Sequence, residues 1–205
     1  MLMSQLILIR HGQSTWNAEN RFTGWVDSPL SDRGRTEAKQ AGDRLAAEGV
    51  RVDRAFTSTL RRAIDTGRIV LDALGQDSLE QEQAWELNER FYGALTGRNK
   101  AQTVQEFGEE QVRIWRRSYD TPPPGGESLR DTANRVLPYF FRVIVPATRE
   151  HGVVLVSAHG NSLRAIVKEL DGLDDEAVIG LEIATGVPLI YQMADGHPAS
   201  KRIVE

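Results

Sequence analysis

The sequence predicts an α/β protein in which helices flank a mostly parallel central sheet. Two observations favour this class. Gln5–Ile9 and Val153–Ser157 are short, continuous apolar runs, which are typical of strands buried on both faces. Helical patterns separate the predicted strands along the chain, and this alternation favours βαβ units with right-handed crossovers.

Three further strands complete the predicted sheet. Arg54–Thr57 is a short candidate, and Glu80–Ala84 is another. Val187–Met193 follows the turn-forming pair Thr185-Gly186 and is expected to be a late strand.

Four helices are predicted between and around these strands. Ser31 or Asp32 is expected to cap the first, which stops at Gly49. Pro138 and Pro146 are expected to kink or break the third. The predicted helices span residues 31–49, 60–74, 128–148 and 161–170.

The chain is expected to form a single domain, residues 1–205, with one excursion. Residues 83–126 are mostly polar with scattered aromatic side chains, and they end in the turn-rich run Thr121–Gly126. No repeat or linker divides the chain. We therefore expect a helical cap over the carboxyl ends of the strands.

The composition narrows the class of protein. With 40% hydrophobic and 26% charged residues, the chain is typical of a soluble globular protein. It has no cysteine, which excludes disulfides and thiolate chemistry. The apolar run Leu6–Ile9 meets Arg10 too soon for a secretory segment or membrane span, so a cytoplasmic protein without a membrane partner is expected. A net charge of −4 argues against nucleic acid, so an anionic substrate would need a local cluster of arginines.

Two histidines follow the two most apolar strands in the same pattern. Arg10-His11-Gly12 comes directly after the first strand, and Ala158-His159-Gly160 after the strand Val153–Ser157. A lone histidine is more often a core residue. If the two strands are neighbours, however, both imidazoles lie at the carboxyl edge where ligands bind. Gly12 is expected to let a ligand oxygen approach the backbone, and Ser14 to cap a helix whose N–H groups favour phosphate.

Two imidazoles beside arginines suit phosphoryl transfer. A neutral imidazole can attack phosphorus, and cations must then stabilise the equatorial oxygens. Arg10 follows a strand, and Arg62 begins a helix where the dipole disfavours a cation unless an anion lies in front of it. On spacing alone, Arg61, Arg116 and Arg117 are better explained as surface charges.

Glu89 is a candidate proton donor and acceptor. Its apolar and aromatic neighbours are expected to desolvate it and raise its pKa. An ordinary carboxylate paired with Arg90 is the alternative, and spacing does not decide between them. The four histidines lack i, i+4 ligand spacing, and no metal is expected.

Several motifs carry a family resemblance. The segment Leu8–Asn17 resembles the signature of the histidine phosphatase superfamily. Further motifs resemble the cofactor-dependent phosphoglycerate mutases, and the resemblance spans residues 5–193. These motifs are Asn20–Trp25, Leu87–Gly93, Trp115–Arg117, Ala158–Arg164 and Thr185–Leu189.

The resemblance implies a reaction and a set of roles. It implies interconversion of 3-phosphoglycerate and 2-phosphoglycerate in glycolysis and gluconeogenesis, with 2,3-bisphosphoglycerate as the cofactor that phosphorylates His11. It assigns proton transfer to Glu89 and support of the transferring group to His159. It also implies small phosphorylated sugar acids as partners, no metal, and a homo-oligomer, either dimer or tetramer.

The same resemblance implies the binding residues. The phosphate pocket would comprise Arg10, Asn17, Arg62 and His159, with Ser14 at the helix start beside them. The other substrate groups would meet Thr23, Gly24, Tyr92, Lys100, Arg116, Arg117, Gly160 and Asn161.

Two alternatives and two departures accompany this interpretation. A phosphatase on the same fold would also need His11 and His159, and a non-enzymatic binding module would require these groups to be missing. Thr121–Gly126 replaces a longer segment of some family members, and the sequence stops at Glu205 without the tail found in many. With less of the site covered, water can reach the phosphohistidine more easily, which predicts faster hydrolysis of the phosphoenzyme.

Overall fold

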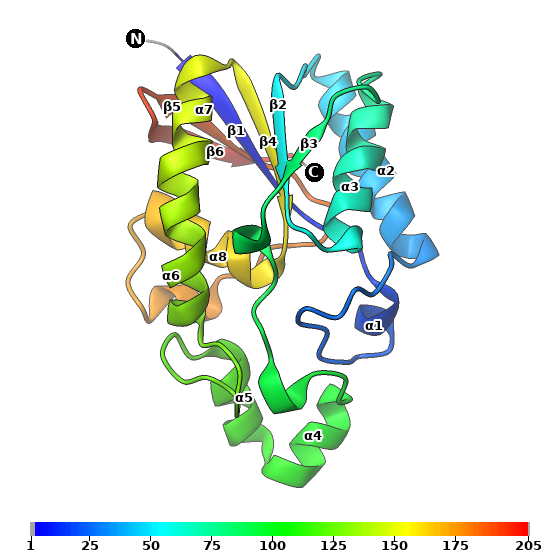
Figure 1. Ribbon diagram of the computed structural model, residues 1–205, viewed down its shortest axis with the longest axis vertical. Helices are drawn as coiled ribbons and strands as arrows, with labels where there is room; N and C mark the ends of the chain where they lie inside the picture. The colour runs from blue at the N-terminus through cyan, green and yellow to red at the C-terminus, as the bar shows by residue number, and fades with distance from the viewer. Residues whose placement is uncertain (1–2, 205) are drawn as a thin grey trace.

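The computed structural model describes residues 3–204 and contains a six-stranded sheet with helices on both faces (Figure 1). The strand order is β3-β2-β4-β1-β5-β6. The first four strands in this order are mutually parallel, whereas β5 runs antiparallel to both β1 and β6. This architecture confirms the predicted class. The strands are β1 Met3–Arg10, β2 Arg54–Thr57, β3 Gln81–Gln83, β4 Val153–Ala158, β5 Leu189–Ala194 and β6 His197–Ile203.

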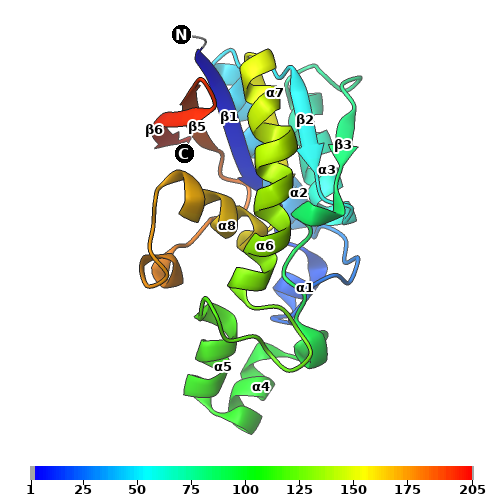
Figure 2. The ribbon, with the colours of Figure 1, turned by 60° about the vertical axis from the view of Figure 1, so that its left-hand side comes forward.

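Two groups of helices cover the sheet. Helices α2 and α3 pack on one face, and α6, α7 and α8 on the other (Figure 2). The helices are α1 Thr15–Ala18, α2 Asp32–Ala47, α3 Arg61–Ala73, α4 Lys100–Phe107, α5 Glu109–Arg117, α6 Leu129–Tyr139, α7 Val145–Glu150 and α8 Gly160–Leu170. Short 3₁₀ turns lie at Trp85–Leu87, Gly93–Leu95 and Ala177–Gly180.

Strand β1 lies in the middle of the sheet and contributes to both layers of core. Leu6 and Leu8 pack toward α6, α7 and α8, whereas Ile7 and Ile9 pack toward α2 and α3. Side chains alternate between the two faces of a strand, so a continuous apolar run fills both cores. The end of β1 is thereby fixed between two packed layers.

The sequence interpretation missed strand β6. His197–Ile203 pairs with β5 at the edge of the sheet, and every residue in it is exposed. It carries Pro198, which cannot donate a ladder hydrogen bond and is confined to edges and bulges. An exposed edge strand with a proline gives no apolar alternation that could predict it. The predicted late strand Val187–Met193 corresponds to β5, and β6 follows it as a strand that was not predicted.

The two prolines do not break the predicted helix. The helical path continues from α6 through a π-helical turn, Phe140–Ile144, into α7. Pro138 lies in the last turn of α6, and Pro146 lies in the first turn of α7, where the missing N–H is tolerated. A widened π turn between them accommodates the lost hydrogen bonds.

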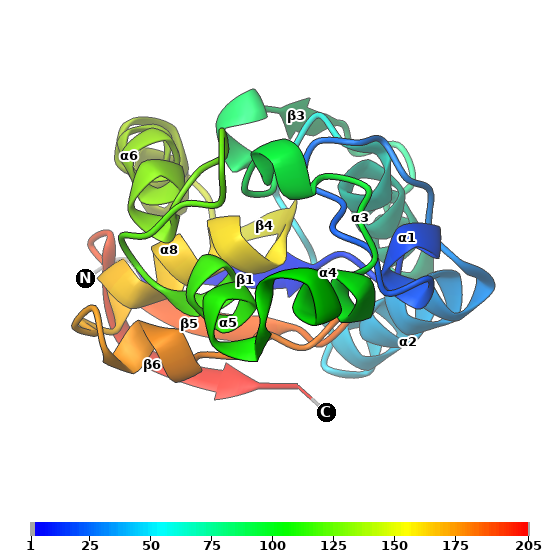
Figure 3. The ribbon, with the colours of Figure 1, turned by 90° about the horizontal axis from the view of Figure 1, so that it is seen from below.

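Helices α4 and α5 lie beyond the carboxyl ends of β1 and β4, with α5 on the side of α8 and α4 on the side of α1 (Figure 3). Phe22, Leu95 and Val112 form a small apolar core of their own beneath these two helices. The grouping of residues 1–205 into one domain with this cap stays a prediction. None of the helices within residues 3–204 combines the length and apolar character needed to cross a bilayer.

Candidate active site

The two strand-end histidines meet because β1 and β4 are neighbours. The register pairs Arg10 with Ala158, and the His11 amide donates to the Ala158 carbonyl at 3.0 Å. The imidazole rings of His11 and His159 then lie with their centroids 4.9 Å apart in an edge-on arrangement. The prediction that the two strands place both imidazoles side by side is confirmed.

Hydrogen bonding fixes the tautomer of His11. Nδ1 lies 2.7 Å from the Gly12 carbonyl, and a carbonyl only accepts, so Nδ1 carries the proton. Nε2 is left with a lone pair, toward which Arg62 Nε donates at 3.3 Å. Burial, with the charges of Arg62 and Arg10, holds the pKa of His11 well below its usual value. His11 is therefore a neutral imidazole with a free nucleophilic nitrogen.

Arg62 is held rigidly beside this nitrogen. Its Nη1 donates to the Val26 carbonyl at 2.9 Å and its Nη2 to the Gly24 carbonyl at 2.7 Å. Burial lowers the pKa of Arg62 to about 10, so the guanidinium stays protonated at neutral pH. Two loop carbonyls thus orient a buried cation toward any group bound to His11.

Arg10 approaches the same point from the end of β1. Its Nη1 donates to the Ile183 carbonyl at 2.8 Å, whereas its buried Nε has no protein partner among residues 3–204. A buried N–H of this kind calls for an acceptor, and an anionic ligand would supply it. Gly160 lies directly beside the guanidinium, because a Cβ at that residue would be in van der Waals contact with the guanidinium carbon at 3.5 Å.

His159 lies behind His11 and is fully buried. Its Nε2 is 2.7 Å from the hydroxyl of Ser58, which follows β2. Burial, together with the charges of Arg62 and His11, holds the pKa of His159 well below its usual value. His159 does not line the open pocket, although its ring contacts that of His11.

Glu89 has a lowered pKa, which corrects the prediction that its environment raises it. Burial acts to raise the pKa, as expected from the aromatic neighbours. That effect is outweighed by the Arg90 amide, the charge of Arg62 and the Asn161 side chain, all of which favour the carboxylate. Nor does Glu89 form an ion pair with the Arg90 side chain: the contact is the Arg90 backbone N–H donating at 2.8 Å.

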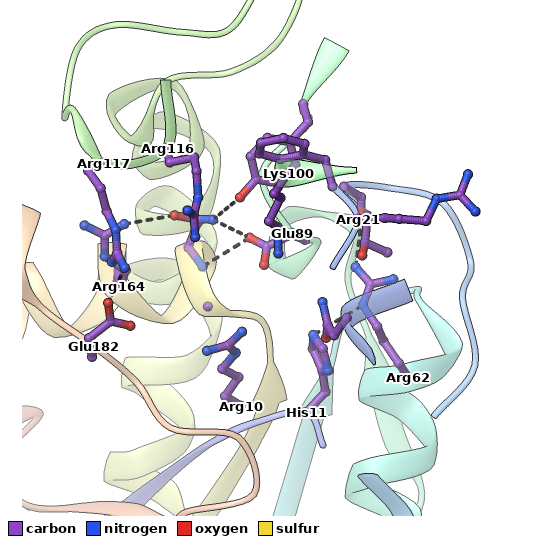
Figure 4. Close-up of a pocket in the computed structure, with 17 residues that line it drawn as sticks. Arg10, His11, Arg21, Arg62, Glu89, Lys100, Arg116, Arg117, Arg164 and Glu182 are labelled. Carbon is purple, nitrogen blue, oxygen red and sulfur yellow. Dashed lines mark hydrogen bonds and ion pairs between the residues drawn. The ribbon is translucent and has the colours of Figure 1, made fainter. Parts of the chain in front are cut away.

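These groups surround an open pocket at the carboxyl edge of the sheet (Figure 4). We call Arg10, His11 and Arg62 the pocket floor, behind which His159 lies, and Lys100, Arg116 and Arg117, from α4 and α5, the pocket wall. Of the described residues that line the pocket, seven are lysine or arginine and two are glutamate. A local cluster of arginines, opposite in sign to the net charge of the chain, was predicted, and the lining has this character. The predicted residues that line it are Arg10, His11, Asn17, Thr23, Gly24, Arg62, Glu89, Tyr92, Lys100, Arg116, Arg117, Gly160 and Asn161.

Two predicted positions near His11 have other roles in the structure. Ser14 is buried outside the lining, and its hydroxyl accepts from the Asn17 amide at 3.1 Å as the cap of α1. α1 is a single turn of four residues. Gly12 does not face a ligand: a Cβ there would lie 2.1 Å from the Gly34 carbonyl oxygen, so its small size lets α2 approach β1.

Sequence reasoning missed four residues of the lining. They are Arg21, Phe22, Arg164 and Glu182. Arg164 could have been found, because it lies three residues after Asn161 and therefore on the same face of α8. Glu182 carries no such signal, and its carboxylate forms an ion pair with Arg117 across the pocket. Within residues 3–204, no group of three or more histidine or acidic side chains is arranged to hold a metal ion.

Comparison with known proteins places the chain in a family. The model of the histidine phosphatase superfamily (branch 1) matches residues 6–205. A 2,3-bisphosphoglycerate-dependent phosphoglycerate mutase of Mesorhizobium japonicum is 53% identical over 98% of each chain. One from Brucella canis is 54% identical over 97% of each chain. The chain belongs to the histidine phosphatase superfamily and, within it, to the family of 2,3-bisphosphoglycerate-dependent phosphoglycerate mutases.

Solved structures share the fold at lower identity. A mycobacterial glucosyl-3-phosphoglycerate phosphatase in complex with VO3 has a TM-score of 0.80 and 27% identity, covering 92% of each chain. Bacillus stearothermophilus YhfR has a TM-score of 0.81 and 27% identity, covering 95% of this chain and 94% of its own. This chain therefore shares its α/β fold with both of these proteins.

Proposed function

We propose that this protein interconverts 3-phosphoglycerate and 2-phosphoglycerate through a phosphohistidine at His11. The observation that carries the proposal is the neutral His11 with a free Nε2, beside His159 and Arg62, at the base of a cation-lined pocket. Identity of 53–54% over nearly the whole chain to mutases primed by 2,3-bisphosphoglycerate supports the same activity.

The residues present fit such a cofactor. Two phosphates and a carboxylate need many cationic donors, which the seven lysine and arginine side chains of the lining supply. Arg10 and Arg62 would hold the phosphate nearest His11, and Lys100, Arg116 and Arg117 the groups farther away. When bound, 2,3-bisphosphoglycerate supplies the phosphoryl group that primes His11.

From phosphorylated His11, the floor and Glu89 perform the transfer. A substrate hydroxyl attacks phosphorus, the P–N bond breaks, and its electron pair returns to Nε2. Glu89, ionised by its lowered pKa, accepts the hydroxyl proton. Arg10 and Arg62 neutralise the charge on the equatorial oxygens. In the return transfer, Glu89 gives the proton back to the oxygen that leaves phosphorus, and Nε2 again takes the phosphoryl group.

A phosphatase would use the same floor with water in place of the sugar hydroxyl. Two observations favour the mutase. The structural neighbours described as phosphatases are about half as identical to this chain as the mutases are. The wall also adds three cations to those of the floor, which suits a substrate with a second anionic group.

One assay separates the two functions. The protein is incubated with 3-phosphoglycerate and a catalytic amount of 2,3-bisphosphoglycerate, and both 2-phosphoglycerate and inorganic phosphate are measured. We expect 2-phosphoglycerate to form faster than phosphate, and His11→Ala to abolish both turnover and acid-labile phosphate on the protein. Faster release of phosphate, or turnover retained by His11→Ala, overturns the proposal.

We also propose a cytoplasmic homo-oligomer, dimer or tetramer, on the strength of the family. Sedimentation of the purified protein tests the assembly, and a monomeric mass contradicts it.

A further inference from the structure

A buried hydrogen-bonded chain leads from Arg164 to the carboxyl group of Glu89. Arg164 lies in α8, one turn after Asn161, and is 5% exposed. Its Nη1 donates to Asn161 Oδ1 at 3.1 Å, and its Nη2 donates to the Val178 carbonyl at 2.5 Å. Asn161 in turn donates to Glu89 (Figure 4). None of these contacts depends on the exposed surface of the protein.

The two carboxyl oxygens of Glu89 have different surroundings. Oε1 accepts three N–H groups: the Arg90 amide at 2.8 Å, the Asn161 amide at 3.1 Å and Asn161 Nδ2 at 3.0 Å. Among residues 3–204, Oε2 has no hydrogen-bond partner within the protein, and it faces the pocket beside Gly160. Only one oxygen is therefore available to a substrate.

Asn161 Nδ2 donates to Oε1 only while the side-chain amide of Asn161 does not flip, which would exchange its nitrogen and oxygen. When Glu89 is ionised, its charge alone would orient the amide nitrogen toward it. When Glu89 is protonated in mid-reaction, a turned amide could present Oδ1 and accept the carboxyl proton at Oε1. That arrangement would trap the proton on the wrong oxygen and raise the pKa.

Arg164 removes this alternative. A guanidinium only donates, so the Asn161 atom that faces it must be the carbonyl oxygen, and the nitrogen must face Glu89 in both protonation states. We propose that Arg164 is a positioning residue that locks the Asn161 amide as a donor and thereby confines the transferable proton of Glu89 to Oε2. The inference deepens the proposed mutase mechanism and rests on Glu89 being its proton carrier.

Other charged and titratable groups around Glu89 stay in place when Arg164 is changed. They come from β1, α3, α4, α6 and the loop that carries Glu89. These groups are Arg10, Arg62, Tyr92, Lys100 and Arg135, whose Nη2 donates to the Glu89 backbone carbonyl. Arg135 holds the Glu89 backbone, and the others act on Glu89 through charge. Tyr92 Oη also accepts from Asn161 Nδ2 at 3.3 Å, but Tyr92 has no hydrogen bond to the Asn161 amide oxygen. A change in Arg164 can thus be separated from them.

The experiment compares Arg164→Met, Arg164→Lys, Asn161→Ala and the double variant Arg164→Met with Asn161→Ala. The carboxyl ¹³C resonance of Glu89, assigned with Glu89→Gln, gives its pKa in the free protein, and kcat is measured from pH 5 to pH 8. We expect Arg164→Met to raise the pKa of Glu89 and to lower kcat by about 10-fold more at pH 5 than at pH 8. Arg164→Lys should restore most of both, because an ammonium also only donates.

The double variant tests whether Arg164 acts on Glu89 through the Asn161 amide. Once Asn161 is alanine, Arg164→Met should shift the pKa of Glu89 and the pH profile no further, because Arg164 acts through that amide. An equal shift in both backgrounds overturns the proposal, as does an unchanged pKa in Arg164→Met. Val178→Ala is the matched structural control: it loosens the same anchoring loop and lowers Tm but should leave the pKa of Glu89 unchanged.

The failures of the two proposals are distinguishable. The ¹³C titration needs no substrate, so it tests the role of Arg164 even if the wild-type protein releases phosphate instead of 2-phosphoglycerate. If the wild-type protein isomerises the substrate but the variants show no coupling between Arg164 and Asn161, only this inference is wrong and the proposed function stands.

Discussion

The pocket floor and the pocket wall are both cationic, but they are built differently. The floor lies where the ends of the central strands meet helix α3: His11, with His159 behind it, is buried, and the Arg62 guanidinium of α3 is fixed by two backbone carbonyls. The wall is carried by α4 and α5, and its three cationic residues are partly exposed to solvent. Rigid, desolvated cations stabilise charge that develops in the transition state, whereas accessible cations attract the ground state and transition state alike. The floor should therefore set the rate and the wall the affinity.

The largest effect is expected in the floor. Arg62→Gln keeps much of the shape but removes the charge beside Nε2, and we expect kcat to fall by about 10²- to 10³-fold with a smaller change in KM. Burial, Arg62 and Arg10 together hold the pKa of His11 low, so losing Arg62 lets that pKa rise. A raised pKa protonates the nucleophile at higher pH, which moves the acid limb of kcat/KM upward. Steady-state kinetics across pH measure both.

Arg61→Gln is the matched control for this variant. Arg61 is the neighbouring residue of α3, but it is exposed and lies outside the pocket lining. Its kinetics should match the wild type. If Arg62→Gln raises KM but leaves kcat unchanged, the proposed difference between floor and wall is wrong.

A smaller effect of the opposite kind is expected in the wall. Arg116→Gln should raise KM for 3-phosphoglycerate by about 10-fold and leave kcat nearly unchanged, because the lost contact is made equally before and during transfer. Arg113→Gln, one turn earlier on α5 and paired with Glu110, removes the same charge outside the pocket and should have no effect. If kcat falls while KM holds, Arg116 belongs functionally with the floor.

The smallest effect concerns the acid in the wall. Glu182 forms an ion pair with Arg117, so an anionic substrate must compete with it for that guanidinium. The Glu182 side chain is 66% exposed and that of Arg117 31%. Solvent-screened pairs of this kind are weak, so Glu182→Gln should lower KM by only about two- to threefold. Glu176→Gln, also exposed and outside the lining, serves as the control. A raised KM would mean that Glu182 orders Arg117 for binding.

The same division explains how much could be predicted from the sequence. The floor follows from residue pattern, since two apolar strands each followed by His-Gly place His11 and His159 at one edge once the strands pair. The wall does not, because Arg116 and Arg117 end an amphipathic helix like many surface arginines, and only the family resemblance assigned them. Strand β6 escaped prediction because it is exposed and contains Pro198.

The pKa of Glu89 escaped prediction for a different reason. Its aromatic neighbours are visible in the sequence, and their desolvating effect is present as expected. The opposing donors are the Arg90 amide and Asn161, and the second of these comes from a helix 72 residues away in the chain. A sum of opposing effects needs the three-dimensional arrangement, so the sign of the shift could not be derived from local composition.

The position of β1 has a consequence for how the protein is made. Both of its neighbours in the sheet, β4 and β5, belong to the last third of the chain, yet β1 is translated first. On the ribosome, the apolar segment Leu6–Ile9 cannot pair with either partner strand until more than three quarters of the polypeptide has been synthesised. Such long-range pairing slows folding and leaves aggregation-prone apolar surface exposed until the strands pair. We expect the nascent chain to engage chaperones through this segment, and no enzyme to exist until synthesis is almost finished.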